Sequence, residues 1–219
     1  MTNLRVFYHK TGRAKYISHL DITRCMQRAI KRAGLPVWYT EGFNPHIYLT
    51  FALPLSLGYE SESESMDFRL TEELPMEEVC RRLDEALPPD IHVVKVDLQK
   101  NKPDAITAAV YEIRLTDCGD DSAALLEAFH AFLEQETICV EKKTKKGMKT
   151  VDIKPDCQVL SAEKWENGIR IVLRTAAGPS YNINPTLLTD EFLKSRGIPA
   201  ANTQVLRKSV LMENGQEFE

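Results

Sequence analysis

The stretch SHLDITRCMQRAIKRAGLP, residues 18–36, sets the architecture of the first half of the chain. Ser18 and Asp21 have the spacing of a capping box, which predicts a helix that begins at Ser18. Gly34 and Pro36 are typical of a helix end and of the residue just beyond it. Apolar side chains recur at helical spacing between these ends: Ile22, Met26, Ala29 and Ala33. They predict that one face of the helix is buried.

The opposite face of this helix is basic. Its cations are Arg24, Arg28, Lys31 and Arg32. Residues 1–58 contain eight Lys or Arg and two acids, a net charge of +6, whereas the other 20 basic and 30 acidic residues give −10. This asymmetry indicates either a polyanion-binding surface on the first part of the chain or a chance segregation of charge.

The order of the other elements predicts the fold. In the first half, strand-like segments lie at 4–9, 37–40, 48–53, 65–70 and 91–98, and a second helix starts at Pro75. The second half repeats this order, with helices after Asp121 and Asn184. We therefore predict an α+β protein made of two tandem ferredoxin-like (βαββαβ) halves with antiparallel sheets. The predicted domains are 1–99 and 107–219, joined by a linker at 100–106.

Cations also precede the first helix, in HKTGRAKYISHLD, residues 9–21. They are expected in a loop that leads into the amino end of the helix, where free N–H groups and a partial positive charge attract anions. The predicted phosphate or carboxylate site consists of Lys10, Arg13, Lys15, His19, Arg24 and Arg28. The alternative is a solvated loop that ends in an ordinary helix cap.

A second segment, EGFNPHIYLTFALPLSLGYES at residues 41–61, combines a tight turn with aromatic residues. Asn44 and the proline after it favour a turn, which would hold His46 in a fixed position near the basic surface. We expect Asn44 and His46 either to contact a ligand or to serve only as turn residues. Phe43 and Phe51 are expected in the hydrophobic core.

Two further segments are charged. In EKKTKKGMKTVDIKP, residues 141–155, lysines surround a predicted hairpin loop. They are Lys142, Lys143, Lys145, Lys146 and Lys149. They predict a second clamp on phosphates, with a solvated loop tip as the alternative. In SESESMD, residues 61–67, Glu62 and Glu64 alternate along the chain and predict an exposed acidic edge.

Several kinds of chemistry find no motif in the sequence. The five cysteines are widely spaced, which favours reduced thiols over disulfides or a cysteine metal site. His9, His19 and His46 lack the tight spacing of zinc ligands. Nucleotide-binding and hydrolase motifs are missing, so we expect no metal and no cofactor. There is no apolar run of membrane-spanning length and no signal-peptide pattern at the amino terminus, so a cytoplasmic protein is expected.

Three stretches together resemble a known family. They are KTGRAKYISHLD (10–21), RAIKRAGLP (28–36) and EGFNPHIYLTFALPLSLG (41–58). They are similar to the radical SAM-linked conserved protein family, uncharacterised bacterial domains that stand alone or are joined to the C-terminus of cobalamin-binding-type radical SAM proteins. KKTKKGMKTVDIKP (142–155) and QVLRKSVL (204–211) resemble the later motifs of that family. The resemblance implies a partner with a 4Fe–4S cluster and carries over no catalytic residues.

Three functions follow as hypotheses. The first is a non-catalytic module that binds RNA, either tRNA or rRNA, and presents it to a radical SAM enzyme. Its cations would hold phosphates, and His46 with His19 would contact a base or a 2′-hydroxyl. The second is a metal-independent RNA-processing or RNA-modifying enzyme that uses His46 or His19 as acid–base. The third is a protein-interaction subunit of a radical SAM complex, whose basic face docks an acidic patch.

Overall fold

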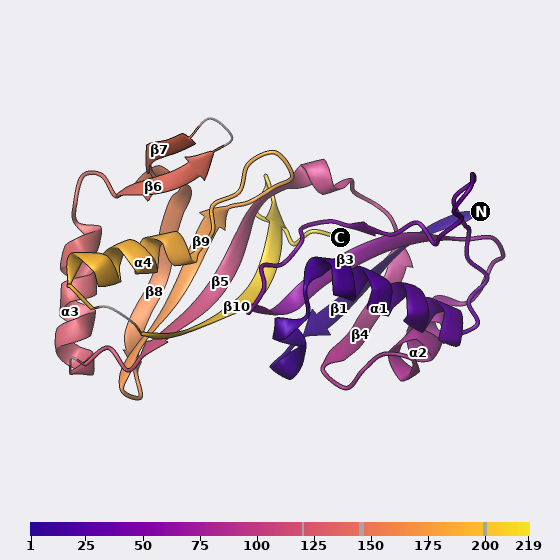
Figure 1. Ribbon diagram of the computed structural model, residues 1–219, viewed down its shortest axis with the longest axis horizontal. Helices are drawn as coiled ribbons and strands as arrows, with labels where there is room; N and C mark the ends of the chain where they lie inside the picture. Colours follow the sequence, from indigo (N-terminus) through magenta and orange to yellow (C-terminus); the bar gives the residue numbers. More distant parts are fainter. Residues whose placement is uncertain (120, 145–146, 199–200) are drawn as a thin grey trace. The chain divides into compact units, whose positions relative to one another are not determined.

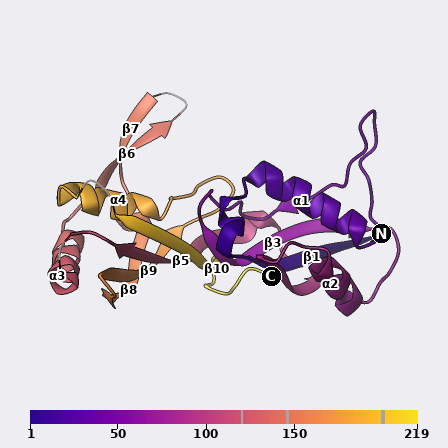
Figure 2. The ribbon, with the colours of Figure 1, turned by 60° about the horizontal axis from the view of Figure 1, so that its bottom comes forward.

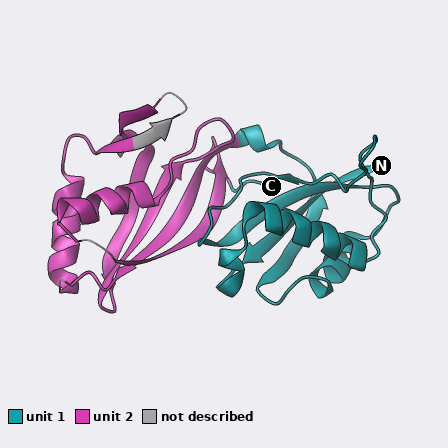
Figure 3. Cartoon of the chain, viewed as in Figure 1, with its two compact units in different colours: residues 1–105, 217–219 teal, residues 106–216 magenta. Residues whose placement is uncertain are grey.

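Residues 1–119, 121–144, 147–198 and 201–219 are described by the computed structural model (Figure 1); the side chains of residues 142–144 are not among them. The chain divides into two units, residues 1–105 with 217–219 and residues 106–216 (Figure 3). The residues predicted as a linker, 100–106, include the 3-10 turn η2 (Pro103–Ala105). Glu217–Glu219, predicted to end the C-terminal domain, return to the first unit.

The first unit contains a sheet in the order β4-β1-β3, with a short strand β2 beside β3. The strands are β1 (Thr2–Lys10), β2 (Thr50–Phe51), β3 (Glu60–Leu70) and β4 (Ile91–Leu98). Its helices are α1 (His19–Arg32) and α2 (Met76–Glu85), and a 3-10 turn η1 (Gly12–Tyr16) precedes α1. Strand β1 runs antiparallel to both β3 and β4.

Helix α1 forms where the sequence predicts it. Ser18 is the N-cap, and its Oγ accepts a hydrogen bond from the backbone N–H of Asp21 at 3.2 Å. Gly34 follows the last turn with a φ of +62°, a backbone conformation that glycine adopts without strain. The buried residues of the helix are Ile22, Met26, Ala29 and Ile30. They join one hydrophobic core with strands β1, β3 and β4 and with α2, so the basic face of α1 points away from that core.

The segment between α1 and β2 is less regular than predicted. In place of a strand over 37–40, Val37 makes a single bridge to Leu70 and Tyr39 makes one to Ile47. The turn between them interrupts the pairing, because Gly42 has a φ of +115° that extended strands do not adopt. The strand expected at 48–53 is accordingly limited to the two residues of β2.

Strand β3 is longer than the predicted 65–70 and begins at Glu60. It lies between β1 and β2, so both of its edges are paired along part of its length. Glu62 is exposed, but Glu64 lies opposite Tyr8 of β1 and is only 4% exposed. The predicted exposed acidic edge is therefore wrong for Glu64, because it lies on the face of the sheet that packs beside Ile17 and Ile22.

The second unit contains a sheet in the order β10-β5-β9-β8. These strands are β5 (Ile106–Thr116), β8 (Cys157–Trp165), β9 (Gly168–Ala176) and β10 (Asn202–Met212). The helices α3 (Ser122–Leu133) and α4 (Thr186–Ser195) meet through the rings of Phe129 and Phe192, 5.1 Å apart. Strands β6 (Cys139–Thr144) and β7 (Gly147–Asp152) pair with each other in a separate two-stranded ribbon (Figure 2). The 3-10 turn η3 (Lys154–Asp156) precedes β8.

The described part of the chain thus has four α-helices, and the strand pairs within each unit run antiparallel. This confirms an α+β fold with mostly antiparallel sheet. The assignment of the two halves as ferredoxin-like domains stays a prediction.

Candidate nucleic-acid interface

The exposed face of α1 carries cations with little neutralisation. Arg24 Nη1 lies 3.4 Å from Oδ1 of Asp21, one turn earlier in the helix. Arg28 and Lys31 are also exposed, and within the described residues neither has a carboxylate partner. Because Arg24, Arg28 and Lys31 lie at helical spacing, they share one face, which we call the basic stripe.

The segment 37–48 lies directly beside the basic stripe. The side-chain amide Nε2 of Gln27 donates a hydrogen bond to the backbone oxygen of Ile47 at 3.0 Å. One turn later, Lys31 Nζ lies 5.7 Å from the centroid of the Tyr39 ring, within the range of a cation–π contact. The helix therefore places its cations next to the residues of the GFNPH turn. We call the basic stripe together with residues 39–48 the helix–turn surface.

His46 is held in a fixed orientation by this turn. Its backbone N–H donates to Thr40 Oγ1 at 3.1 Å, and the backbone N–H of Thr40 donates to the carbonyl of His46 at 2.9 Å. The ring Nδ1 lies 3.0 Å from the carbonyl oxygen of Asn44. Thr40 Oγ1 also lies 3.1 Å from Nδ1, so both hydrogen-bond partners of the ring contact Nδ1. His46 is exposed, so Nε2 is the ring atom left to contact a ligand.

Aromatic side chains are exposed on the same segment. Phe43 is fully exposed at the tip of the turn, and Tyr48 is 56% exposed. The predicted core position of Phe43 is therefore wrong, because the turn carries its side chain away from the sheet; Phe51, in β2, is half-buried. Exposed aromatic rings beside cations are the combination that binds single-stranded nucleic acids, through stacking and phosphate contacts.

The cations that precede α1 do not converge as expected. Lys10 is the last residue of β1 and is only 3% exposed, so its predicted place in a loop is wrong. The reason is that the strand continues through Lys10. Lys15 Nζ lies 3.6 Å from Oε1 of Glu60, which offsets its charge. Arg13 is exposed in η1. In the described part of the chain, Arg13 alone of these three residues is an exposed cation whose side chain has no carboxylate partner, and its backbone N–H donates to Asp90 Oδ2 at 3.0 Å.

His19 lies apart from His46. It is the first residue of α1, and its ring meets the ring of Phe51 edge-on, with centroids 5.1 Å apart. The residue of α1 that contacts the turn is Gln27, about 12 Å farther along the helix axis at the ordinary rise per residue. The two histidines are therefore not brought together as an acid–base pair.

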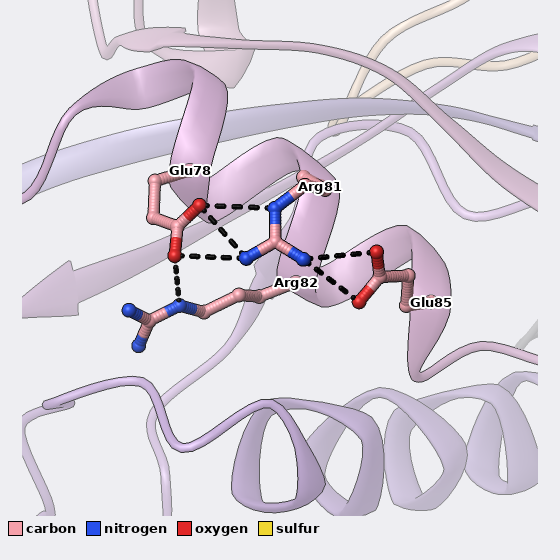
Figure 4. Close-up of polar contacts among 4 residues, drawn as sticks. All are labelled: Glu78, Arg81, Arg82 and Glu85. Carbon is pink, nitrogen blue, oxygen red and sulfur yellow. Dashed lines mark hydrogen bonds and ion pairs between the residues drawn. The ribbon is translucent and has the colours of Figure 1, made fainter.

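Helix α2 does not extend the basic stripe. Arg81 donates to the carboxylates of both Glu78 and Glu85, at 2.9 Å in each case, and Arg82 Nε donates to Glu78 at 2.6 Å (Figure 4). These hydrogen bonds, first from Arg82 and then from Arg81, lower the pKa of Glu78. On the α1 side, Arg32 donates to the backbone oxygen of Ala86 and so is directed at the end of α2.

The lysine cluster belongs to the second unit. Lys149 is exposed on β7, where it pairs with Lys142 of β6 in the register of the ribbon. The side chains of Lys142 and Lys143, and the whole of Lys145 and Lys146, lie outside the described residues. The second phosphate clamp stays a prediction.

No group of three or more His, Cys, Asp or Glu side chains in residues 1–119, 121–144, 147–198 and 201–219 is arranged to hold a metal ion. No helix within the same ranges has the length and apolar character needed to cross a membrane.

A family model described as "Uncharacterized protein conserved in bacteria (DUF2344)" matches residues 3–185. No curated protein matches the chain. Since the matched region covers well over half of the sequence, the chain belongs to the bacterial family DUF2344.

Proposed function

We propose that this protein is a non-catalytic RNA-binding module, whose ligand is a tRNA or rRNA with an accessible single-stranded segment. The observation that carries the proposal is that the basic stripe lies beside the turn. The Gln27–Ile47 hydrogen bond and the Lys31–Tyr39 contact hold the two together. Cations bind phosphates without reading sequence, whereas exposed rings and the free Nε2 of His46 suit unstacked bases.

The two units also support this reading through their strand orders. The first unit has β4-β1-β3 with β2 beside β3, and the second has β10-β5-β9-β8. Both orders, with helices after the first and third main strands, fit a ferredoxin-like (βαββαβ) arrangement. We therefore interpret the protein as a tandem of ferredoxin-like domains, an arrangement common among RNA-binding proteins. This support is by analogy of fold alone.

A radical SAM enzyme is the proposed partner. Its support is the resemblance of residues 10–21, 28–36 and 41–58 to radical SAM-linked proteins. In this proposal the module holds the RNA while the partner carries out the reaction. The hypothesis of an RNA-processing enzyme has weaker support, because His19 begins α1 whereas the turn that holds His46 contacts the helix at Gln27, about 12 Å farther along its axis. Neither histidine touches a second acid–base group on the helix–turn surface.

The proposal is tested by the salt dependence of RNA binding. Fluorescence anisotropy of a labelled single-stranded RNA, measured with the purified protein over a series of salt concentrations, should give a linear fall of log affinity with log salt. Replacement of both stripe cations, Arg28→Gln with Lys31→Gln, should weaken binding. It should also reduce the slope of log affinity against log salt by about 1.4, since each phosphate that is no longer neutralised contributes ~0.7 to that slope.

A matched control separates a local site from net charge. The pair Arg81→Gln with Arg82→Gln removes the same charge from α2, where carboxylates already neutralise it. We expect this control to bind RNA within about twofold of the native protein, since cations that are already paired release few counterions. Equal weakening by the two double variants, or native binding that does not respond to salt, would remove the proposal. Binding of an acidic protein in place of RNA would favour the protein-interaction hypothesis.

A further inference from the structure

A pocket opens on the first unit at the edge formed by residues 38–50 and β3. Its cavity volume is about 100 Å³, and it is partly open to solvent. The residues that give it chemical character are Trp38, Tyr48, Thr50, Asp67, Arg69 and Gln99. Asp67 and Arg69 alternate along β3 with the core residues Met66, Phe68 and Leu70, so their side chains point to the face of the sheet opposite the core that α1 covers.

The aromatic part of the lining is fixed by its neighbours. The rings of Trp38 and Tyr48 meet at 73° with centroids 6.4 Å apart. The guanidinium of Arg69 lies 5.3 Å from the centroid of the Trp38 ring, and its Nε donates to Asn3 Oδ1 at 2.9 Å. Aromatic rings and arginine planes are the surfaces on which unstacked nucleobases are held.

The polar part of the lining is built on a buried carboxylate. Asp67 is only 7% exposed, and Arg5 binds it from behind with two bonds, Nε to Oδ1 at 2.7 Å and Nη2 to Oδ2 at 2.8 Å. Gln99 Nε2 also donates to Asp67 Oδ2 at 2.8 Å. Since a carboxylate only accepts, this bond fixes the amide of Gln99 with Nε2 toward Asp67 and Oε1 on the other side.

These groups match the edge of a base. Gln99 presents an amide oxygen as an acceptor and keeps a second N–H as a donor, and Asp67 Oδ1 keeps a lone pair beyond its bond to Arg5. A base presents the same kinds of group on its Watson–Crick edge. Arg5 neutralises the carboxylate, so the pocket does not favour a metal ion, and its aromatic and amide groups suit a flat, hydrogen-bonding ring.

We propose that this pocket receives a single unstacked nucleobase of the RNA strand whose phosphates lie on the basic stripe. The inference rests on the proposed function and adds to it the place where one base leaves the strand. Trp38 and Tyr39 are consecutive and have contacts on different sides, with Arg69 and with Lys31 respectively. A strand that crosses this edge therefore meets the cations first and the base pocket second.

Trp38 itself is the reporter for the test. The chain has two tryptophans, and the other, Trp165, is in β8 of the second unit. In a Trp165→Phe protein, the emission of Trp38 is recorded while RNA oligonucleotides, the same oligonucleotides with one abasic site, and the four nucleoside monophosphates are added. Anisotropy of the labelled RNA is recorded in the same samples, so binding of the strand and occupation of the pocket are read separately.

Binding of RNA should quench Trp38, and a nucleoside monophosphate should quench it at higher concentration. Tyr48→Ala should weaken the quenching by roughly 5- to 150-fold, which is the range for removal of one ring on which a base stacks. Leu57→Ala, at an exposed apolar residue that does not line the pocket, is the matched control and should leave it unchanged.

The outcomes distinguish the two proposals. A rise in anisotropy with unchanged Trp38 emission overturns the pocket and leaves the RNA-binding function standing. Quenching by nucleoside monophosphates with no binding of RNA overturns the proposed function and identifies a pocket for free nucleotides. Quenching that Tyr48→Ala does not affect also overturns the pocket, because the ring would then have no part in holding the base.

Discussion

The buried ion pair between Arg5 and Asp67 gives a prediction whose size follows from the structure. Arg5 is 0% exposed. Its guanidinium makes two bonds to Asp67, donates to the backbone oxygen of Asn101 at 2.8 Å, and lies 4.2 Å from the centroid of the Phe218 ring. Arg5→Met keeps a long apolar side chain but leaves Asp67 buried with Gln99 as its remaining side-chain donor.

Removal of one partner from a buried pair costs about 3–5 kcal/mol of unfolding free energy, because the other charge stays without compensation. The double variant Arg5→Met with Asp67→Leu removes both charges and should recover at least roughly half of that loss. The difference between the double variant and the sum of the single variants measures the coupling within the pair.

The assay is urea unfolding at pH 7 in the Trp165→Phe background, in which Trp38 reports on the first unit alone. If Arg5→Met lowers the unfolding free energy by less than about 1 kcal/mol, the reasoning is refuted, because an exposed ion pair contributes that much. Strict additivity of the two single variants would also refute it, because it would mean that the two charges do not interact in the folded protein.

Two further predictions concern a helix cap and the half-buried carboxylate of Asp97. Ser18→Ala removes the acceptor for the N–H of Asp21 and should lower the unfolding free energy by about 1 kcal/mol in urea titrations. Ser18→Thr keeps a hydroxyl acceptor and should retain most of the stability that the cap contributes. Equal losses in the two variants would contradict a capping role. Hydrogen bonds from Lys100 and then Lys95 lower the pKa of Asp97 to about 2. Because this pKa is depressed in the folded state, the stabilisation is complete above pH ~4 and is lost as the pH falls toward 2. The melting temperature of Asp97→Asn should therefore lie below that of the native protein at pH 6 and approach it at pH 2; a difference that does not change with pH would contradict this assignment.

The sequence was sufficient where the structure depends on neighbours in the chain. Ser18, Asp21 and Gly34 define α1 because capping and helix termination act within a few residues. Asp121 likewise caps α3 by accepting from the N–H of Ala123 at 3.0 Å. The alternation of apolar residues was enough to predict most strands of the two units and hence the α+β class.

The sequence was insufficient where burial depends on distant partners. Glu64 and Lys10 belong to hydrophilic stretches, yet both lie on the face of the sheet that packs beside Ile17 and Ile22. Phe43 is apolar, but the turn at Gly42 directs it into solvent. Secondary-structure signals are local, whereas exposure depends on the distant segments that pack on each face of a sheet.

In the candidate site, too, local features could be predicted from the sequence and contacts between distant residues could not. The basic stripe could be read from helical spacing, and the fixed turn at His46 from its proline. The contact of Lys31 with Tyr39, and the pocket that joins Trp38 to Asp67, could not be predicted, because they bring together residues that are 8 to 29 positions apart in the chain. No periodic signal in the sequence marks such contacts.

The measurement that bears most directly on the helix–turn surface is ultraviolet crosslinking of the intact protein to RNA, followed by mass spectrometry of the tryptic peptides. Trypsin releases residues 33–69 as one peptide, since no Lys or Arg lies between Arg32 and Arg69. We expect RNA adducts to concentrate in that peptide, at Tyr39, His46 or Tyr48, and to disappear in the Arg28→Gln, Lys31→Gln variant. Adducts confined to other peptides, or recovery of no more RNA than from that variant, would contradict the account.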